Sequence, residues 1–238
     1  MKSLGKFFLN LVACFMVLIC KLIEAFVKIR ITPFNASRFG HLAANPQLFI
    51  AQNLSMGSQS VRWRLFFTGP VCNRQLFSMW QRRFPIFENR FLWALFQYAE
   101  PILARSPIFQ PLPHPNSIHK VHEMVERAGA VLSFNEQDEK VGRALLESIG
   151  IREEDWFVCF NGRELAKSDK IGNRAHRNAD IHTYFKAARY VADAGGFAIR
   201  VGDPSGGPLP ESMLHPRIVD YAYEHRSDFG DVYLLGKC

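Results

Sequence analysis

Two short apolar runs, separated by a polar loop and a helical pattern, are the clearest feature of the hydrophobic pattern. Residues 156–160 and 197–201 are almost uninterruptedly apolar, as expected of strands buried on both faces. Between them, apolar residues recur at helical spacing until Gly195 and Gly196, at Ile181, Tyr184, Phe185, Ala188, Val191 and Ala192. The pattern predicts strand, loop, helix and strand, which is one right-handed crossover unit of a parallel sheet.

The rest of the chain also alternates between strand-like and helix-like patterns, which predicts an α/β fold. Strands are expected at 26–31, 62–67 and 231–235. Helices are expected at about 38–54, 73–83, 85–98, 117–129, 135–150 and 215–224, with a proline-rich loop at 106–116. The strand at 231–235 would lack a neighbour on one side. It therefore predicts an exposed apolar edge and association through that edge.

The N-terminus is apolar from residue 7 to residue 20, interrupted only by Asn10 and followed by Lys21 and Glu24. A helix over about 4–26 fits this pattern, with the two charged side chains reaching the interface or pairing. Three interpretations compete: a membrane helix, a cleaved signal peptide, and a lipoprotein signal ending at Cys14. No small-residue cleavage site follows the run, and the stretch before Cys14 is short, so we expect a membrane helix at 1–25.

Length and charge narrow the classes of protein. The chain has 238 residues, enough for one large or two small domains, and a boundary is expected near Gly150. Residues 1–100 hold 12 Lys/Arg and 3 Asp/Glu, whereas 101–238 hold 17 and 19. A basic front half behind an apolar N-terminus favours an anionic membrane surface over nucleic acid, because no basic helix or zinc spacing is present. The five cysteines form no Cys-x-x-Cys pair, which favours a reducing compartment and no structural metal.

Candidate chemistry collects after the strands at 156–160 and 197–201, where the carboxyl ends of parallel strands bind ligands. A helix N-terminus preceded by arginines is typical of an anion site, above all for phosphate. The alternative is that this loop is only a solvated turn. The residues at or near this edge are Arg163, Arg174, His176, Arg177, Asn178, Arg200 and Asp203.

Four motifs in order resemble a bacterial family of glycosyltransferases for surface polysaccharides. They are RFGHLAAN at 38–45, RNADI with a following Tyr at 177–184, IRVGD at 199–203 and IVDYA at 218–222. The resemblance spans roughly 26–238 and implies a Rossmann-like GT-B architecture. It implies a front, acceptor-side domain at 26–150 and a partial donor-binding domain at 151–238. Family chains continue past Cys238 with another strand and a Gly/Ser-rich loop, so an incomplete C-terminal parallel-sheet domain and a truncated chain are expected.

The implied activity is transfer of a sugar from a nucleotide-sugar donor to a cell-surface polysaccharide or lipid-linked acceptor. The catalytic part would be cytoplasmic and membrane-associated, with no nucleic acid as partner. A truncated, non-catalytic membrane-associated remnant or binding protein is the alternative. Two departures from the family pattern lie near the expected donor site: the chain has Asn161-Gly162-Arg163 where a His-Val-Arg-like run is usual, and His176 where an aromatic residue is usual.

Roles follow for individual residues. Arg163 and Arg177 would neutralise the donor diphosphate, and Asn178 would bind it or simply cap the following helix. Arg200 and Asp203 complete the expected donor set. On the acceptor side, His41 is the candidate catalytic base, or it bonds backbone in a tight turn, and Arg38 would bind acceptor phosphate or support that turn. No Asp-x-Asp motif is present, so we expect a metal-independent reaction without a cofactor.

Overall fold

The computed structural model describes residues 11–12, 14–15, 18–23, 26, 29–56, 63–104, 106, 108–113, 121–162 and 179–238. The chain is α/β and divides into two compact units, Met1–Ser133 and Phe134–Cys238. The division therefore falls before the helix expected at 135–150. The boundary expected from the sequence, near Gly150, lies after that helix. The reason is that this helix packs within the second unit, where Leu145 and Leu146 join the core around Ile151 and Phe197.

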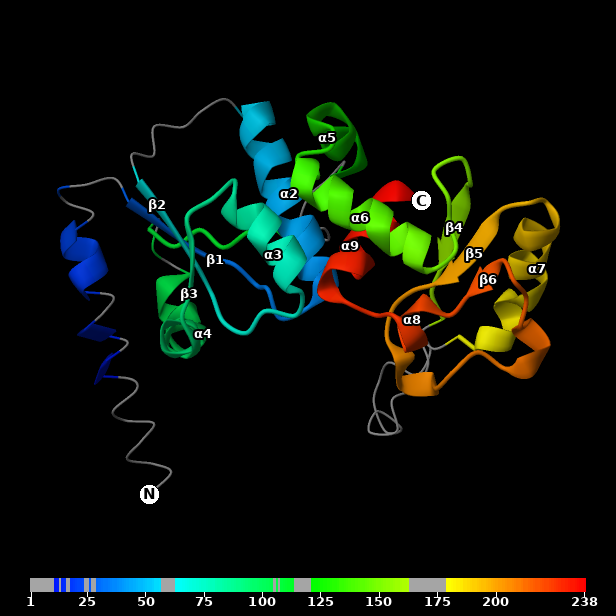
Figure 1. Cartoon of the computed structure of the whole chain (residues 1–238). Helices are drawn as coiled ribbons and strands as arrows, with labels where there is room; N and C mark the ends of the chain where they lie inside the picture. Colours follow the sequence, from blue (N-terminus) through cyan, green and yellow to red (C-terminus); the bar gives the residue numbers. More distant parts are fainter. Residues whose placement is uncertain are drawn as a thin grey trace, which may run out of the picture. The chain divides into compact units, whose positions relative to one another are not determined.

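The first unit contains a parallel sheet of β1 (Ile29–Pro33), β2 (Trp63–Thr68) and β3 (Ile86–Glu88), in the order β1-β2-β3 (Figure 1). On the other side of β1, Ile31 pairs in parallel with Phe109. The Ile31 amide donates to the Ile108 carbonyl (2.7 Å), and the Gln110 amide donates to the Ile31 carbonyl (2.9 Å). The segment 108–110 therefore extends the sheet beyond β1.

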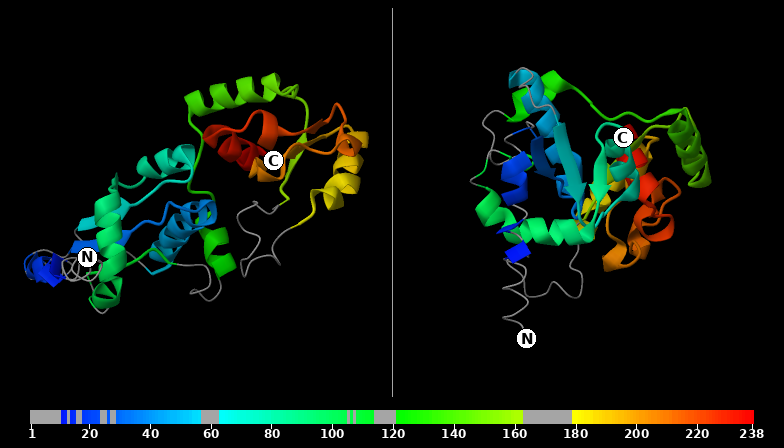
Figure 2. Two further views of the ribbon diagram at one scale, coloured as in Figure 1. Left: turned by 90° about the horizontal axis from the view of Figure 1, so that it is seen from below. Right: turned by 90° about the vertical axis from the view of Figure 1, so that its left-hand side faces the viewer.

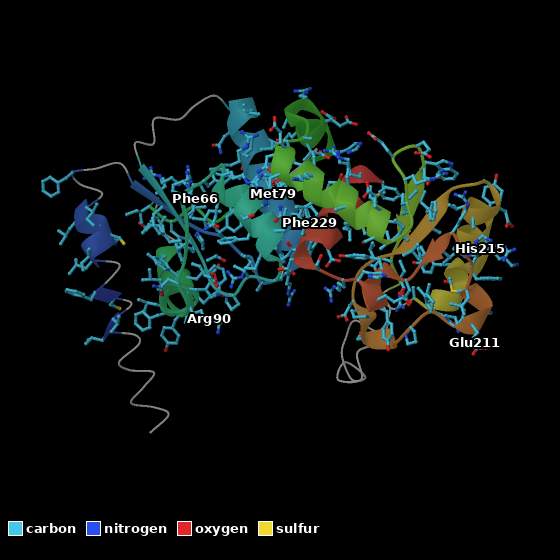
Figure 3. The ribbon with its side chains drawn as sticks, viewed as in Figure 1. Phe66, Met79, Arg90, Glu211, His215 and Phe229 are labelled. Atoms are coloured by element: carbon cyan, nitrogen blue, oxygen red, sulfur yellow. The ribbon has the colours of Figure 1, made fainter. Side chains whose placement is uncertain are left out.

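Helices cover both faces of this sheet: α2 (Phe39–Met56), α3 (Arg74–Gln81) and α4 (Arg90–Leu103), while α5 (Val121–Ala128) packs beside α2. Because successive side chains of a strand point to opposite faces, Phe66 packs against Phe49 of α2 at 5.8 Å between ring centroids. Phe67 packs against Phe96 of α4 at 4.3 Å. Figure 2 shows α4 on the opposite side of the sheet from α3, and Figure 3 labels Phe66 on β2 and Met79 on α3.

The predicted helix at 85–98 is wrong in its first part. Residues 86–88 form β3, in register with Phe66–Thr68 of β2. Asn89 then caps α4, since its side-chain oxygen accepts the Leu92 amide at 2.9 Å. Asn73 caps α3 in the same way. Sheet pairing thus overrides the helical pattern of this short segment, and the cap at Asn89 makes the helix begin only at residue 90.

The N-terminal segment is helical where it is described between residues 11 and 23. Cys20 is buried in the core cluster of β1, β2 and α4, and Val12 packs against that cluster. Most of its other described large apolar side chains are exposed, namely Leu11, Phe15, Leu18, Ile19, Leu22, Ile23 and Phe26. Among the residues that the structure describes, no helix combines the length and the hydropathy needed to cross a bilayer.

The second unit contains a parallel sheet of β4 (Phe157–Phe160), β5 (Phe197–Arg200) and β6 (Ile218–Val219), in that order. A 3₁₀ turn, η3 (Ile181–Tyr184), and α7 (Phe185–Asp193) connect β4 to β5, so the predicted strand–helix–strand unit with parallel pairing is confirmed. Helix α6 (Glu136–Ser148) starts at a capping box formed by Asn135 and Asp138. It is followed by Gly150 at φ 81°, a left-handed value that suits glycine at a helix end.

The predictions for the C-terminal part need correction. The region 215–224 forms β6 before the short helix α8 (Tyr221–Glu224) begins. The predicted strand at 231–235 is wrong, because these residues lie in α9 (Asp228–Lys237), which contains Phe229 near its start (Figure 3). The Ser227 hydroxyl caps α9 by accepting the Gly230 amide at 3.0 Å.

Helix α9 packs closely on α6, which explains why its apolar run resembles a buried strand. Val232, Tyr233 and Leu234 are consecutive and buried. The Tyr233 ring lies over Gly142, where an added Cβ would come within 2.0 Å of it. The Tyr233 hydroxyl and the Lys237 ammonium donate to the two oxygens of Glu139, at 3.1 and 2.8 Å. The expected apolar sheet edge at 231–235 is therefore replaced by helix packing.

Candidate functional site

The candidate site is a cavity of about 260 Å³ in the first unit, at the carboxyl end of β1. Its size lies just below the usual range for small-molecule sites, about 300–1,000 Å³. Four segments contribute to its wall: the end of β1 with the following loop, the first turns of α2, one face of α4, and the chain from Phe109 to Leu112. The lining residues are Pro33, Asn35, His41, Asn45, Trp93, Phe96, Gln97, Glu100, Phe109, Pro111 and Leu112.

The strand order explains why a cavity forms at this point. Across the sheet, each strand from β3 to β2 to β1 comes earlier in the chain than the one before it. The next neighbour beyond β1 is the segment 108–110, which comes later in the chain, so the order reverses at β1. In open α/β sheets, connections on either side of such a reversal run to opposite faces and leave a crevice that binds ligands. Pro33 and Phe109, at the ends of the two adjacent extended segments, both line the cavity.

His41 is the predicted catalytic residue that the structure places in this cavity. It is the third residue of α2 and is partly exposed. Its Nδ1 lies 3.4 Å from Nδ2 of Asn45, one helical turn later, and the donor and acceptor roles depend on the imidazole tautomer. Asn45 is only 7% exposed, and its Oδ1 has no hydrogen-bond partner among the residues that the structure describes. The pair thus combines an imidazole at the cavity wall with a buried, incompletely bonded carboxamide.

One face of α4 supplies the opposite wall, through Trp93, Phe96, Gln97 and Glu100. Their spacing of three and four residues aligns them on one side of the helix. The Trp93 ring lies against Gly69, where a Cβ would come within 2.3 Å of Trp93 Cδ1. The glycine that follows β2 therefore allows the indole to lie close to the sheet and fixes an aromatic surface beside the polar groups.

The loop between β1 and α2 is held by the neighbouring strand. The Phe34 amide donates to the Phe67 carbonyl at 2.7 Å, and the Ala36 amide donates to Oγ1 of Thr68 at 3.3 Å. Arg38, expected on the acceptor side, follows this loop and is exposed. Its carbonyl accepts the Leu42 amide at 2.9 Å and so begins α2. Arg38 is not among the residues that line the cavity, and its role in acceptor binding stays a prediction.

In the second unit, the ends of β4 and β5 come together as the sequence predicted. The side chain of Asn161 lies against Gly202, within 2.6 Å of a Cβ built there, and Gly202 has a φ of 106°. Asp203, expected in the donor site, accepts the Ser205 amide at 3.0 Å and caps a 3₁₀ turn, η4 (Pro204–Gly206). Three further expected donor residues, Arg163, Arg177 and Asn178, lie outside the described residues, as do Arg174 and His176. The helical segment that follows is capped by Asp180 rather than by Asn178, since the Asp180 carboxylate accepts the His182 amide at 2.9 Å.

Arg200, the remaining expected donor residue, is buried at 2% exposure. Its Nη1 lies 3.2 Å from both carboxylate oxygens of Asp220 and donates to the Gly207 carbonyl at 2.7 Å. Asp220 also accepts the Leu209 amide at 2.7 Å. These contacts anchor the 204–209 connection against β5. Direct contact of Arg200 with a donor stays a prediction.

Sequence reasoning missed Asn45, Trp93, Gln97 and Glu100. Asn45 follows His41 at the i, i+4 spacing of a helix, and this was the signal that could have identified it. Trp93, Gln97 and Glu100 belong to a segment whose pattern predicts an aromatic helix. That pattern does not show which strand ends the helix packs against, so it could not place these residues in the site. Within the described ranges, no cluster of three or more His, Cys, Asp or Glu side chains is arranged to hold a metal ion.

The chain matches no protein-family model, and no curated protein or solved structure is significantly similar to it.

Proposed function

We propose that this chain is a glycosyltransferase of GT-B type, whose first unit binds the sugar acceptor and whose second unit binds the nucleotide-sugar donor. The observation that carries the proposal is the position of His41. A residue expected from the sequence to be the base lines a cavity at the point of strand reversal, beside amide and carboxylate groups. The resemblance of the four motifs to glycosyltransferases of surface polysaccharides is the second support.

The chemistry requires removal of a proton from the acceptor hydroxyl while its oxygen attacks the anomeric carbon and the nucleoside diphosphate leaves. A neutral imidazole accepts at one nitrogen only. For Nε2 of His41 to take the proton, Nδ1 must carry the ring hydrogen and donate it to Asn45. The carboxamide then presents Oδ1 to the ring instead of Nδ2, an exchange that leaves its shape unchanged. Asn45 would thus hold the ring and stabilise the imidazolium that forms.

The donor side of the proposal rests on the second unit. Its parallel sheet brings Asn161 and Gly202 together at the ends of β4 and β5, where α/β sheets bind ligands. The connection between these strands carries Arg163 and Arg177, which we propose to neutralise the leaving diphosphate. We further propose that no metal ion is required, since the two arginines supply the positive charge.

The first test is binding of nucleoside diphosphates and nucleotide-sugars to the full chain by isothermal titration calorimetry. Arg163→Ala and Arg177→Ala are each expected to weaken binding at least tenfold. Arg189→Ala is the matched control, because Arg189 lies on the surface of α7 and pairs with Asp193 at 3.1 Å. A folded chain that binds none of these compounds would refute the enzyme proposal and leave a non-catalytic binding protein.

A transfer assay tests the acceptor side. With a donor found by binding, His41→Ala is expected to lower kcat by 10² to 10⁴, the usual contribution of a general base. His122→Ala is the matched control, since His122 is exposed on α5 in the same unit and pairs with Glu126 at 3.4 Å. Equal loss of activity in both variants, or no loss in His41→Ala, would show that His41 is not the base.

We also propose that the protein associates with the membrane surface through its N-terminal segment. The segment exposes the side chains of Leu11, Phe15, Leu18 and Leu22 and also carries Lys21, and such a segment partitions into an anionic interface. Flotation with vesicles of phosphatidylglycerol and phosphatidylcholine is expected to recover the full chain. Phe15→Ser/Leu18→Ser should reduce the recovery, and equal recovery of this variant would contradict the proposal.

A further inference from the structure

We infer that the cavity in the first unit selects an uncharged, hydroxyl-rich sugar ring, admits an amino sugar, and rejects an anionic one such as a uronic acid. The inference rests on the proposed function and specifies its acceptor. Three features of the cavity wall support it: its charge, its polar side chains and its aromatic surface.

The charge of the wall argues against an anion. Glu100 is the carboxylate that lines the cavity, and no Lys or Arg is among the described lining residues. Among those described residues, a carboxylate or phosphate bound inside would face Glu100 without a guanidinium or ammonium partner. Like charges a few ångströms apart repel each other even when water partly screens them. An ammonium group of an amino sugar would instead be attracted to Glu100.

The hydrogen-bonding groups of the wall suit hydroxyls. Asn45 is more than nine-tenths buried and uses one carboxamide atom toward His41, while its Oδ1 has no partner among the described residues. If the carboxamide is flipped so that Oδ1 faces His41, as the proposed base requires, Nδ2 takes the position that Oδ1 held. A hydroxyl both donates and accepts, so it suits a wall that carries an imidazole, carboxamides and a carboxylate. The side-chain amide of Gln97 and the carboxylate of Glu100 add further groups on the α4 wall.

The aromatic part of the wall suits the apolar face of a sugar ring. Trp93 and Phe96 lie one helical turn apart on α4, and the Phe67 ring packs against both, at centroid distances of 6.2 and 4.3 Å. The indole is therefore held by the sheet before any ligand binds, which lowers the ordering cost of binding. With a volume of about 260 Å³, the cavity is suited to a small ligand, such as one sugar ring, rather than to an oligosaccharide.

The test is binding of three probes to the full chain, measured by competition in ligand-observed NMR: methyl glucoside, methyl glucosaminide and methyl glucuronide. Methyl glucuronide is expected to bind about tenfold more weakly than methyl glucoside, and methyl glucosaminide at least as tightly as methyl glucoside. Glu100→Gln should narrow the difference between glucuronide and glucoside to within about threefold. Glu126→Gln, an exposed glutamate of the same unit, is the matched control and should leave the ratio unchanged.

Binding of the glucuronide as tight as that of the glucoside would overturn the inference, as would failure of all three probes to bind the folded chain. An unchanged ratio in Glu100→Gln would also overturn it. These measurements need no donor, so their outcome is separate from that of the transfer assay. Donor-dependent transfer that requires His41 but uses an anionic acceptor would leave the proposed function standing and refute only the inferred selectivity.

Discussion

The buried pair of Arg200 and Asp220 gives a prediction that separates a structural role from a donor-binding role. The two side chains are 2% and 8% exposed, and their closest atoms are 3.2 Å apart. Asp220→Ala removes the carboxylate and leaves the guanidinium buried with the Gly207 carbonyl as a remaining acceptor. It also removes the acceptor of the Leu209 amide.

The expected cost follows from this environment. Removing one partner of a buried ion pair typically costs about 3–5 kcal/mol, because the other charge stays desolvated without its counter-charge. Arg200→Met should be similarly destabilising. The double variant Arg200→Met/Asp220→Leu should cost less than either single change, because it removes both charges and retains apolar volume. Asp193→Ala, which breaks an exposed pair on α7, should cost about 0.5 kcal/mol.

The assay is urea unfolding of the full chain followed by circular dichroism. Hydrogen exchange of the amides at 197–200 localises the loss of stability to the second unit. The reasoning is refuted if Asp220→Ala unfolds at the same urea concentration as the parent chain. It is also refuted if the double variant is less stable than both single variants. Loss of donor binding in Arg200→Met with unchanged stability would assign Arg200 to the donor site instead.

Three further predictions concern the second unit. Gly142→Ala should destabilise the chain by about 1–3 kcal/mol in urea unfolding, because the new methyl group meets the Tyr233 ring, and a neutral result would contradict the close packing. The hydrogen bond from Lys237 lowers the pKa of Glu139 below its usual 4.5, so its contribution is present above that pH and is lost as pH falls through the lowered pKa. Stability measured against pH should therefore show Glu139→Gln less stable than the parent at pH 7, with the difference vanishing in acid. Burial raises the pKa of Cys159 to about 12, so mass spectrometry should find it labelled by iodoacetamide at pH 8 more slowly than the exposed cysteines.

Several elements were predictable because their signals are local. The strands at 157–160 and 197–200 and the helix between them follow from short apolar runs and helical spacing. Helix α6 follows from a cap at Asn135 and a stop at Gly150, both of which act within one turn. His41 was predicted from the motif at 38–45 and was expected in a loop. The structure places it in the first turn of α2, at the wall of the cavity.

Other elements depended on contacts between segments far apart in the sequence. The run at 231–235 suits a buried strand or a buried helix equally well. The Ser227 cap and the packing of Tyr233 over Gly142 decide for a helix. In the same way, β3 forms only because its three residues pair with Phe66–Thr68. Local propensity at such short segments is weak compared with the free energy of burying them against a partner.

The sequence by itself determined the α/β class and most of the elements, because periodicity, caps and turns act over a few residues. Only the tertiary structure decided the strand order, the cavity beside His41, and the presence of Asn45, Trp93 and Glu100 in the wall of one cavity. These depend on which strand pairs with which. The pairing of Ile31 with Phe109 reverses the order of the sheet and opens the crevice, and it joins residues that no local pattern connects.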